Sequence, residues 1–99
     1  MTTYFISRHL GAKVWAAQTG FKIDKQVSHF EPRDTQSGDR ILGTLPVHLA
    51  AIVCARGGLY YHLSLNIPPD LRGKELSVEE MLACDARLEQ YEIKVVTPK

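Results

Sequence analysis

The side chains best suited to chemistry in this chain are histidines, hydroxyls and basic groups that directly follow predicted strands. His9 and His48 occupy such positions, and an imidazole there could accept or donate a proton near neutral pH. Arg8 precedes His9 and could stabilise a reacting phosphate. We therefore assign His48, His9 and Arg8 as candidate catalytic residues. Polar residues near the same strand ends are assigned to ligand binding, namely Ser7, Gly43, Thr44, Ser64, Asn66, Arg72 and Lys74.

The segment from Gly43 to His48 places a small residue and a hydroxyl where a helix is predicted to begin. Free backbone N–H groups and the helix dipole at such a point could bind a phosphate. Thr44 is equally compatible with an ordinary helix cap, and Pro46 suits the first helical turn. The segment lacks the Gly-Lys-Ser/Thr of a Walker loop and the full Gly-x-Gly-x-x-Gly of dinucleotide enzymes. By itself it leaves both roles open.

Other catalytic classes lack their motifs in this sequence. None of the histidines forms a close ligand pair, and no His-Glu-x-x-His or Cys/His cluster occurs, so we expect neither a metal nor another cofactor. His62 lies within a strand and is expected to be a half-buried, hydrogen-bonded histidine. Cys54 and Cys84 have no redox or metal-ligand spacing and are expected to be buried thiols. The lack of a Gly-x-Ser-x-Gly elbow argues against an acyl-transfer hydrolase.

The bulk composition is that of one small globular domain spanning residues 1–99. Hydrophobic residues make up 44% and charged residues 23% of the chain, which can supply a core. The net charge of +1 gives no field that would attract long nucleic acid, and no apolar run reaches the about 18 residues of a membrane span. We expect a cytoplasmic protein. Because a domain of this size has a limited core, we also expect a homodimer whose interface lies beside the strand carboxyl ends.

Hydrophobic periodicity predicts the elements that position these residues. The predicted strands cover residues 3–7, 23–30, 40–43, 59–65 and 91–96. The fourth of them is apolar enough for the middle of a sheet. The predicted helices are one that ends at Gly20, one over residues 47–55, and one that a Ser77–Glu80 capping box opens and that carries Met81, Leu82 and Leu88. Surface loops are predicted over residues 31–39 and 66–74.

Strands that alternate with helices imply crossover connections and therefore a mainly parallel sheet. We predict a single Rossmann-like α/β domain with helices on both faces of that sheet. In such sheets the ligand crevice lies beyond the carboxyl ends of the strands. Because the polar residues assigned above follow those ends, they are predicted to converge.

Two segments carry the most specific motifs of the chain, Ser-Arg-His-x-Gly-Ala at residues 7–12 and Gly-Thr-Leu-Pro-Val-His-Leu-Ala at residues 43–50. Together with the opening residues 1–9, Trp15-Ala16, residues 61–65 and Arg72-Gly73-Lys74-Glu75-Leu76, they resemble a small CRISPR-associated family, the Csx-sixteen family. The likeness covers most of the chain.

The resemblance implies an accessory protein of type III CRISPR systems, related to the CRISPR-associated Rossmann fold (CARF) domains that sense cyclic oligoadenylates. It implies a ring nuclease that cleaves cyclic tetra-adenylate and switches the antiviral response off. Cleavage without metal would use the ribose 2′-OH as the nucleophile on the adjacent phosphate, with a histidine assisting proton transfer. A two-fold dimer would match the two-fold symmetry of the ring.

Two other functions are also compatible with these residues. A protein of the same fold could sequester or sense the cyclic oligoadenylate without cleaving it, which needs phosphate contacts but no acid or base. A structural or interaction protein would leave the polar strand ends solvated and would bind no phosphate ligand.

Overall fold

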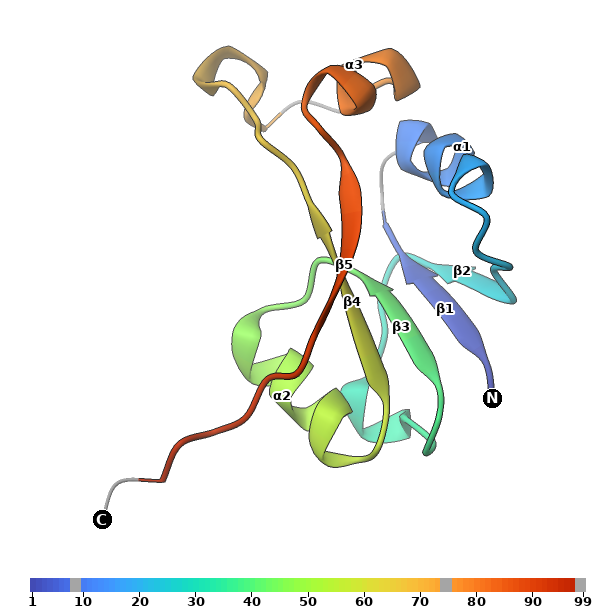
Figure 1. Ribbon diagram of the computed structural model, residues 1–99, viewed down its shortest axis with the longest axis vertical. Coiled ribbons are helices and arrows are strands. Elements are labelled where there is room, and N and C mark those ends of the chain that lie inside the picture. Colours follow the sequence, from blue (N-terminus) through green and yellow to red (C-terminus); the bar gives the residue numbers. More distant parts are fainter. Residues whose placement is uncertain (8–9, 74–75, 98–99) are drawn as a thin grey trace.

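A computed structural model describes residues 1–7, 10–73 and 76–97 of the chain, and for residues 10 and 13 the backbone only. These residues form a five-stranded sheet in the order β2-β1-β3-β4-β5 (Figure 1). The parallel strands are β1 (Thr3–Ile6), β2 (Lys25–Val27), β3 (Arg40–Gly43) and β4 (Leu59–Ser64). β5 (Arg87–Tyr91) pairs with β4 in the antiparallel direction and forms one edge. The sheet is therefore mainly parallel, as predicted.

Helices cover both faces of this sheet, which confirms that part of the prediction. α1 (Leu10–Gln18) and α3 (Val78–Ala83) lie on one face, and α2 (Val47–Ala55) lies on the other (Figure 1). Short 3₁₀ helices, η1 (Pro32–Asp34) and η2 (Pro69–Leu71), occur within the predicted loops. No helix in the described part of the chain is long and apolar enough to cross a membrane.

Each face of the sheet has its own hydrophobic core, because successive strand residues point to opposite faces. Ile41 of β3 packs toward α2, whereas its neighbour Leu42 packs toward α1 and α3. The core on the α1 face consists of Phe5, Ala12, Trp15, Ala16, Leu42, Leu63, Leu76 and Met81. The core on the α2 face consists of Phe30, Ile41, Ala50, Val53 and Tyr60. Burial of each large apolar side chain stabilises the fold by about 1.5–3 kcal/mol.

Gly11 allows α1 to approach the segment that leads into α3. A Cβ atom at this position would overlap the carbonyl oxygen of Leu76 and lie 2.7 Å from the carbonyl carbon of Ser77. Leu76 is itself buried in the core on the α1 face. The glycine is therefore required by close packing between backbones.

The third helix begins where the sequence predicts and ends earlier. Ser77 and Glu80 form the predicted capping box, with the Glu80 amide donating to Ser77 Oγ at 3.2 Å. The helix ends at Ala83, because Asp85 adopts a left-handed conformation with φ of 57°, which an α-helix cannot continue. A short polar residue tolerates this conformation, so Asp85 reverses the chain into β5.

The last strand is displaced from its predicted position. Leu88 belongs to β5 and not to the preceding helix, and the strand covers residues 87–91 instead of 91–96. Pairing with β4 fixes this position, from Ser64 opposite Arg87 to Tyr60 opposite Tyr91. The β-forming residues that follow lie beyond the end of the sheet. Tertiary pairing has overridden local propensity here.

Two other features of the strands differ from the prediction. β2 is only three residues long, because residues 28–30 already leave the sheet. The strand over 59–64 is interior but lies next to the edge strand, and β3 occupies the centre of the sheet instead.

The local structure before α2 and in the first long loop also differs from the prediction. Thr44 does not cap α2, because the helix begins at Val47 with Pro46 as its N-cap and no side-chain cap. The predicted surface loop 31–39 contains two nearly fully buried polar residues, Thr35 and Asp39.

The two cysteines differ in burial. Cys84 is buried as predicted, whereas Cys54 is only half-buried and lies against the segment after β5.

Candidate functional site

A cavity opens at the edge of the sheet where the parallel strands end. The chain leaves β1 toward α1 on one face of the sheet and leaves the neighbouring β3 toward α2 on the other face, so the segments that follow these two strands diverge and leave a crevice. The cavity has a volume of about 710 Å³. Its lining consists of Ile6, Ser7, Ser28, His29, Phe30, Thr44, Leu45, Pro46, Leu49, His62, Leu63, Leu65 and Ile67. Segments that follow all the parallel strands thus contribute to one space.

The lining combines an apolar wall with a polar rim. Ser28, His29 and Thr44 are exposed and Ser7 is half-buried, whereas most other lining residues are aliphatic or aromatic. The described lining contains no lysine or arginine. A surface of this kind can pack against an apolar or aromatic group and hydrogen-bond its polar substituents.

A buried tyrosine organises one wall of the cavity. The hydroxyl of Tyr60 lies 2.9 Å from the Leu45 amide, which donates to it, and 3.2 Å from the Gly43 carbonyl oxygen. The Tyr60 hydroxyl oxygen also lies 2.7 Å from Nδ1 of His62. Burial raises the pKa of the Tyr60 phenol, an effect that the hydrogen bond from Leu45 opposes. The phenol is therefore protonated at neutral pH and links β4 to the segment between β3 and α2.

The same network favours one proton arrangement of His62, the one that satisfies every partner of Tyr60. A phenol has one proton to donate and two lone pairs that accept. All its partners are satisfied when Tyr60 donates to the Gly43 carbonyl and accepts from the Leu45 amide and from His62 Nδ1–H. Neutral His62 then carries its lone pair on Nε2, for which no described residue is a hydrogen-bond partner. A half-buried histidine in the cavity wall can thus accept a proton from a ligand.

The N-terminus of α2 reaches the same cavity without a side-chain cap. Pro46 is the N-cap residue, and its carbonyl accepts from the amides of Leu49 and Ala50 at 3.0 Å. No described residue accepts from the amides of Val47 and His48. The positive end of the helix dipole favours an anionic group at this point.

Gly43 has a structural role beside the cavity. Its φ of 150° favours glycine, and a Cβ atom would lie only 2.7 Å from the Ile6 carbonyl oxygen. The residue therefore permits close approach of β1 and β3, and its carbonyl is held by Tyr60.

The structure brings some of the predicted ligand-binding residues together and separates others. Ser7 and Thr44 line the same cavity, next to Gly43. Ser64, Asn66 and Arg72 do not line it. Asn66 and Arg72 are exposed on the segment between β4 and α3, and the Asn66 amide donates to the Cys84 carbonyl at 2.7 Å.

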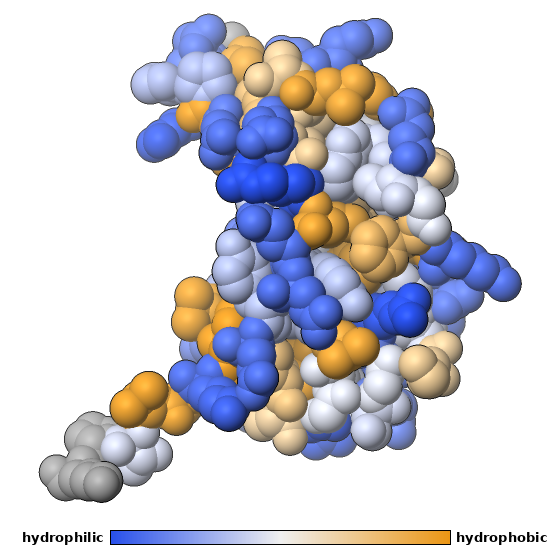
Figure 2. Space-filling model, viewed as in Figure 1, coloured by the Kyte–Doolittle hydropathy of each residue, from blue (hydrophilic) through white to orange (hydrophobic). Residues whose placement is uncertain are grey.

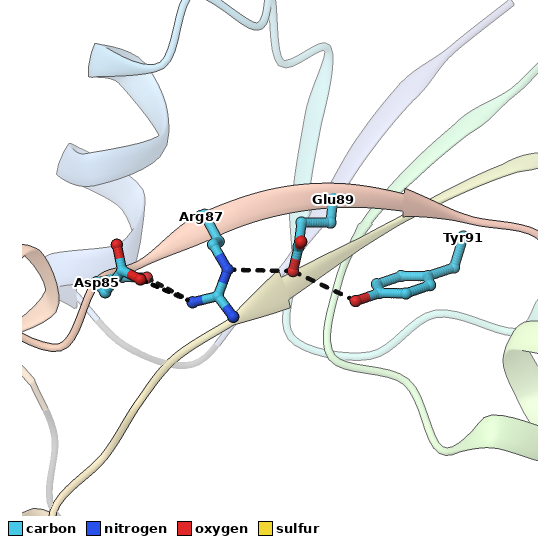
Figure 3. A network of polar contacts seen from close by, with 4 residues as sticks. All are labelled: Asp85, Arg87, Glu89 and Tyr91. Carbon is cyan, nitrogen blue, oxygen red and sulfur yellow. Dashed lines mark hydrogen bonds and ion pairs between the residues drawn. The ribbon is translucent and has the colours of Figure 1, made fainter.

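Ser64 belongs to a polar network on β5. Its hydroxyl donates to the carboxylate of Glu89, and this hydrogen bond is the main reason that the pKa of Glu89 lies below its usual value. Arg87 Nε lies 3.2 Å from Glu89 Oε1, and the Tyr91 hydroxyl lies 3.3 Å from the same atom (Figure 3). Arg87 also forms an ion pair with Asp85 at 3.2 Å (Figure 3). These side chains satisfy one another along the edge strand.

Of the three candidate catalytic residues, the structure describes only His48. His48 is exposed in the first turn of α2 and is absent from the cavity lining. Arg8, His9 and the predicted ligand residue Lys74 lie outside the described residues.

Sequence reasoning missed several polar residues of the cavity. Ser28 and His29 were placed inside a strand over 23–30, and recognising that β2 ends at Val27 would have put them at a strand end. His62 is half-buried and hydrogen-bonded as predicted, but its place in the cavity wall and its pairing with Tyr60 depend on contacts across the sheet. Only their spacing, two residues apart on one face of a strand, points to that pairing.

Comparisons with curated proteins and with solved structures found no match to the chain. A family model described as "Putative CRISPR-associated protein (Cas_VVA1548)" matches residues 4–94. This match includes the whole sheet from Tyr4 onward and every residue that lines the cavity. The chain therefore belongs to this CRISPR-associated family.

Proposed function

We propose that the chain is a ring nuclease of type III CRISPR signalling that binds cyclic tetra-adenylate in the cavity at the strand carboxyl ends and cleaves it to linear adenylates. The observation that carries the proposal is the meeting in one cavity of His62, held by a buried tyrosine, and the uncapped N-terminus of α2. Membership in a CRISPR-associated family supports it. The parallel strand order with its crevice supports a Rossmann-like relationship to CARF domains.

In the proposed reaction the ribose 2′-oxygen attacks the adjacent phosphorus, and the bond from phosphorus to the 5′-oxygen breaks. The products are a 2′,3′-cyclic phosphate and a free 5′-hydroxyl. His62 Nε2 takes the proton of the 2′-OH, and the amides of Val47 and His48 hydrogen-bond the phosphoryl oxygens as charge develops. The His48 side chain, in the first turn of the same helix, is the candidate proton donor to the leaving 5′-oxygen.

The lining suggests how the rest of the ligand is bound. The aromatic ring of Phe30 and the aliphatic wall can pack against an adenine, while the hydroxyls of Ser7, Ser28 and Thr44 can bond ribose or phosphate oxygens. Because the nucleophile is the substrate's own hydroxyl, this route does not require a Lewis acid.

A second candidate is a protein that binds the cyclic oligoadenylate without cleaving it. The apolar character of the lining and its lack of a described lysine or arginine favour this alternative. Without a cationic side chain, the charge that develops on a phosphoryl group during cleavage would be stabilised mainly by backbone amides. Such amides suffice for binding a phosphate but give a weaker rate enhancement.

Incubation of the purified protein with radiolabelled cyclic tetra-adenylate in the presence of EDTA, followed by chromatography, tests the proposal. We expect linear products that end in a 2′,3′-cyclic phosphate. Retention of the intact ring on the protein would favour the binding alternative. If the ring is neither cleaved nor retained, both functions are contradicted.

A further inference from the structure

The chain continues beyond β5 as an extended segment that leaves the body of the molecule. This C-terminal tail, residues 92–97, contains the β-forming run Ile93-Lys94-Val95-Val96. Val95 is 80% exposed and Val96 is 87% exposed. Figure 2 shows this hydrophobic part of the tail standing away from the rest of the surface. An exposed, extended segment rich in β-branched residues is typical of a strand that lacks a partner.

One side of the tail is already in contact with the protein, and the other side is open. The Ile93 amide points toward α2, where Cys54 Sγ lies 3.5 Å away. Because amides alternate sides along an extended chain, those of Glu92 and Lys94 point away from α2. The outer edge of β5 pairs with no other described strand, and no backbone hydrogen bond joins residues 94–97 to another described segment. A continuous open edge thus runs from β5 into the tail.

The sequence of this edge is complementary to itself. An antiparallel pair of two such segments centred on Ile93 places Glu92 opposite Lys94 of the partner subunit, twice by symmetry. The same register places Tyr91 opposite Val95 of the partner subunit. Opposite charges thus meet on one face of the pair, and apolar side chains meet on the other. The outward amides of Glu92 and Lys94 are the groups that this register requires for its hydrogen bonds.

We propose that residues 91–95 pair with the same residues of a second copy of this chain and join two five-stranded sheets into one. In the isolated chain Lys94 Nζ lies 3.0 Å from Glu92 Oε1, and both side chains are more than 70% exposed, so they are free to exchange this contact for one across the dimer. The proposed interface lies at the end of the molecule opposite the cavity, whereas the sequence predicted an interface beside the strand carboxyl ends. It is independent of the proposed function.

Charge exchange at the two central positions tests this register. Glu92→Lys puts like charges opposite each other twice, and we expect the dimer dissociation constant to rise by about tenfold or more. Lys94→Glu should do the same. The double variant Glu92→Lys/Lys94→Glu restores both pairs and should return the constant to within about threefold of wild type. Sedimentation velocity over a concentration series measures all four proteins.

Glu79→Lys, an exposed change on α3 with the same change in net charge, is the matched control and should leave dimerisation unchanged. Val95→Asp supplies a second measurement, because an exposed side chain contributes little to folding of the monomer and the change should still weaken the dimer. A protein that remains monomeric up to about 100 µM would overturn the proposal. So would a dimer that is indifferent to these variants, or a double variant that fails to recover.

Discussion

The two ends of the parallel strands use their polar groups in different ways. At the amino ends, Asp39 is 2% exposed, and its carboxylate accepts from the amides of Thr2 and Gln36 at 2.9 and 3.0 Å. Asp24 likewise accepts from the Thr3 amide at 2.8 Å. These side chains close the loops that return to the strands, and their hydrogen-bonding capacity is used within the fold.

At the carboxyl ends, polar groups of similar kinds remain open. Thr44 precedes α2 without capping it, and the amides of Val47 and His48 have no described acceptor. His62 is hydrogen-bonded through one ring nitrogen and has no described partner for the other. Polar residues thus stabilise the fold at one end of the sheet, whereas at the other end several polar groups have no described partner, so residue type alone does not distinguish the two arrangements.

Replacing the buried carboxylate at the amino end should have the largest effect on stability. Asp39→Ala leaves the amides of Thr2 and Gln36 without their acceptor, and we expect the free energy of unfolding to fall by about 2–4 kcal/mol. Urea denaturation followed by circular dichroism measures the change. Asp39→Asn, which keeps one acceptor oxygen, should lose less. The contrast between the two ends fails if Asp39→Ala is as stable as wild type but binds cyclic tetra-adenylate more weakly.

The reciprocal test is made at the carboxyl end. His62→Asn puts an amide close to the position of Nδ1, where it can still hydrogen-bond Tyr60, but removes the basic Nε2, so single-turnover cleavage of cyclic tetra-adenylate should slow by about 10²-fold. The free energy of unfolding should change by less than about 1 kcal/mol, because a hydrogen bond to Tyr60 is retained. Quenched-flow measurements give the rate and urea denaturation gives the stability.

His48→Asn is the matched variant for that experiment. His48 is exposed and does not line the cavity, so as a proton donor to the leaving group it should contribute less than His62, about tenfold. If His48→Asn removes cleavage while His62→Asn leaves it intact, the assignment of His62 as the base is wrong, and His48, the candidate chosen from the sequence, is the better one.

A change remote from both ends gives a reference for packing. Gly11→Ala introduces a Cβ atom that would overlap the Leu76 carbonyl, so α1 must shift away from the segment before α3. We expect a loss of about 1–3 kcal/mol in the free energy of unfolding, as for other overpacked sites. Thermal and urea denaturation measure it. A stabilised Gly11→Ala protein, which helix propensity alone would favour, would show that this contact is looser than described.

The sequence predicted the parts of the fold that local patterns determine. The helix over residues 47–55 and the strand over 40–43 have the predicted bounds, and the Ser77–Glu80 capping box marked the start of α3. The end of that helix depends on the left-handed conformation of Asp85, and β5 depends on pairing with β4. Neither produces a hydrophobic period that could be recognised in advance.

The candidate site was predictable in place but not in composition. The rule for parallel sheets gave the carboxyl ends, and Ser7 and Thr44 line the cavity there. Ser64 follows the same rule by position, but its hydroxyl bonds Glu89 across an antiparallel edge that the sequence did not reveal. Contacts with segments distant in the sequence decide which polar groups line the cavity. A pattern of polar residues at strand ends does not reveal these contacts.

The smallest expected effect concerns that serine and tests the contrast most finely. The hydrogen bond from Ser64, followed by the charge of Arg87, keeps the pKa of Glu89 below its usual value, so the ionised form is favoured by folding. The stabilisation of the fold by ionised Glu89 is present above the pKa of an unfolded glutamate. It is lost as the pH falls through the pKa of Glu89 in the folded protein. Ser64→Ala should therefore move the Glu89 titration upward toward its ordinary range, as followed by carboxyl ¹³C chemical shifts. Glu89→Gln identifies the resonance and should make acid unfolding depend less on pH. Because Ser64 serves Glu89 and does not line the cavity, Ser64→Ala should bind cyclic tetra-adenylate with wild-type affinity. An affinity that falls while the Glu89 titration stays in place would mean that Ser64 is a ligand residue, and that the open polar groups extend along β4 beyond the cavity.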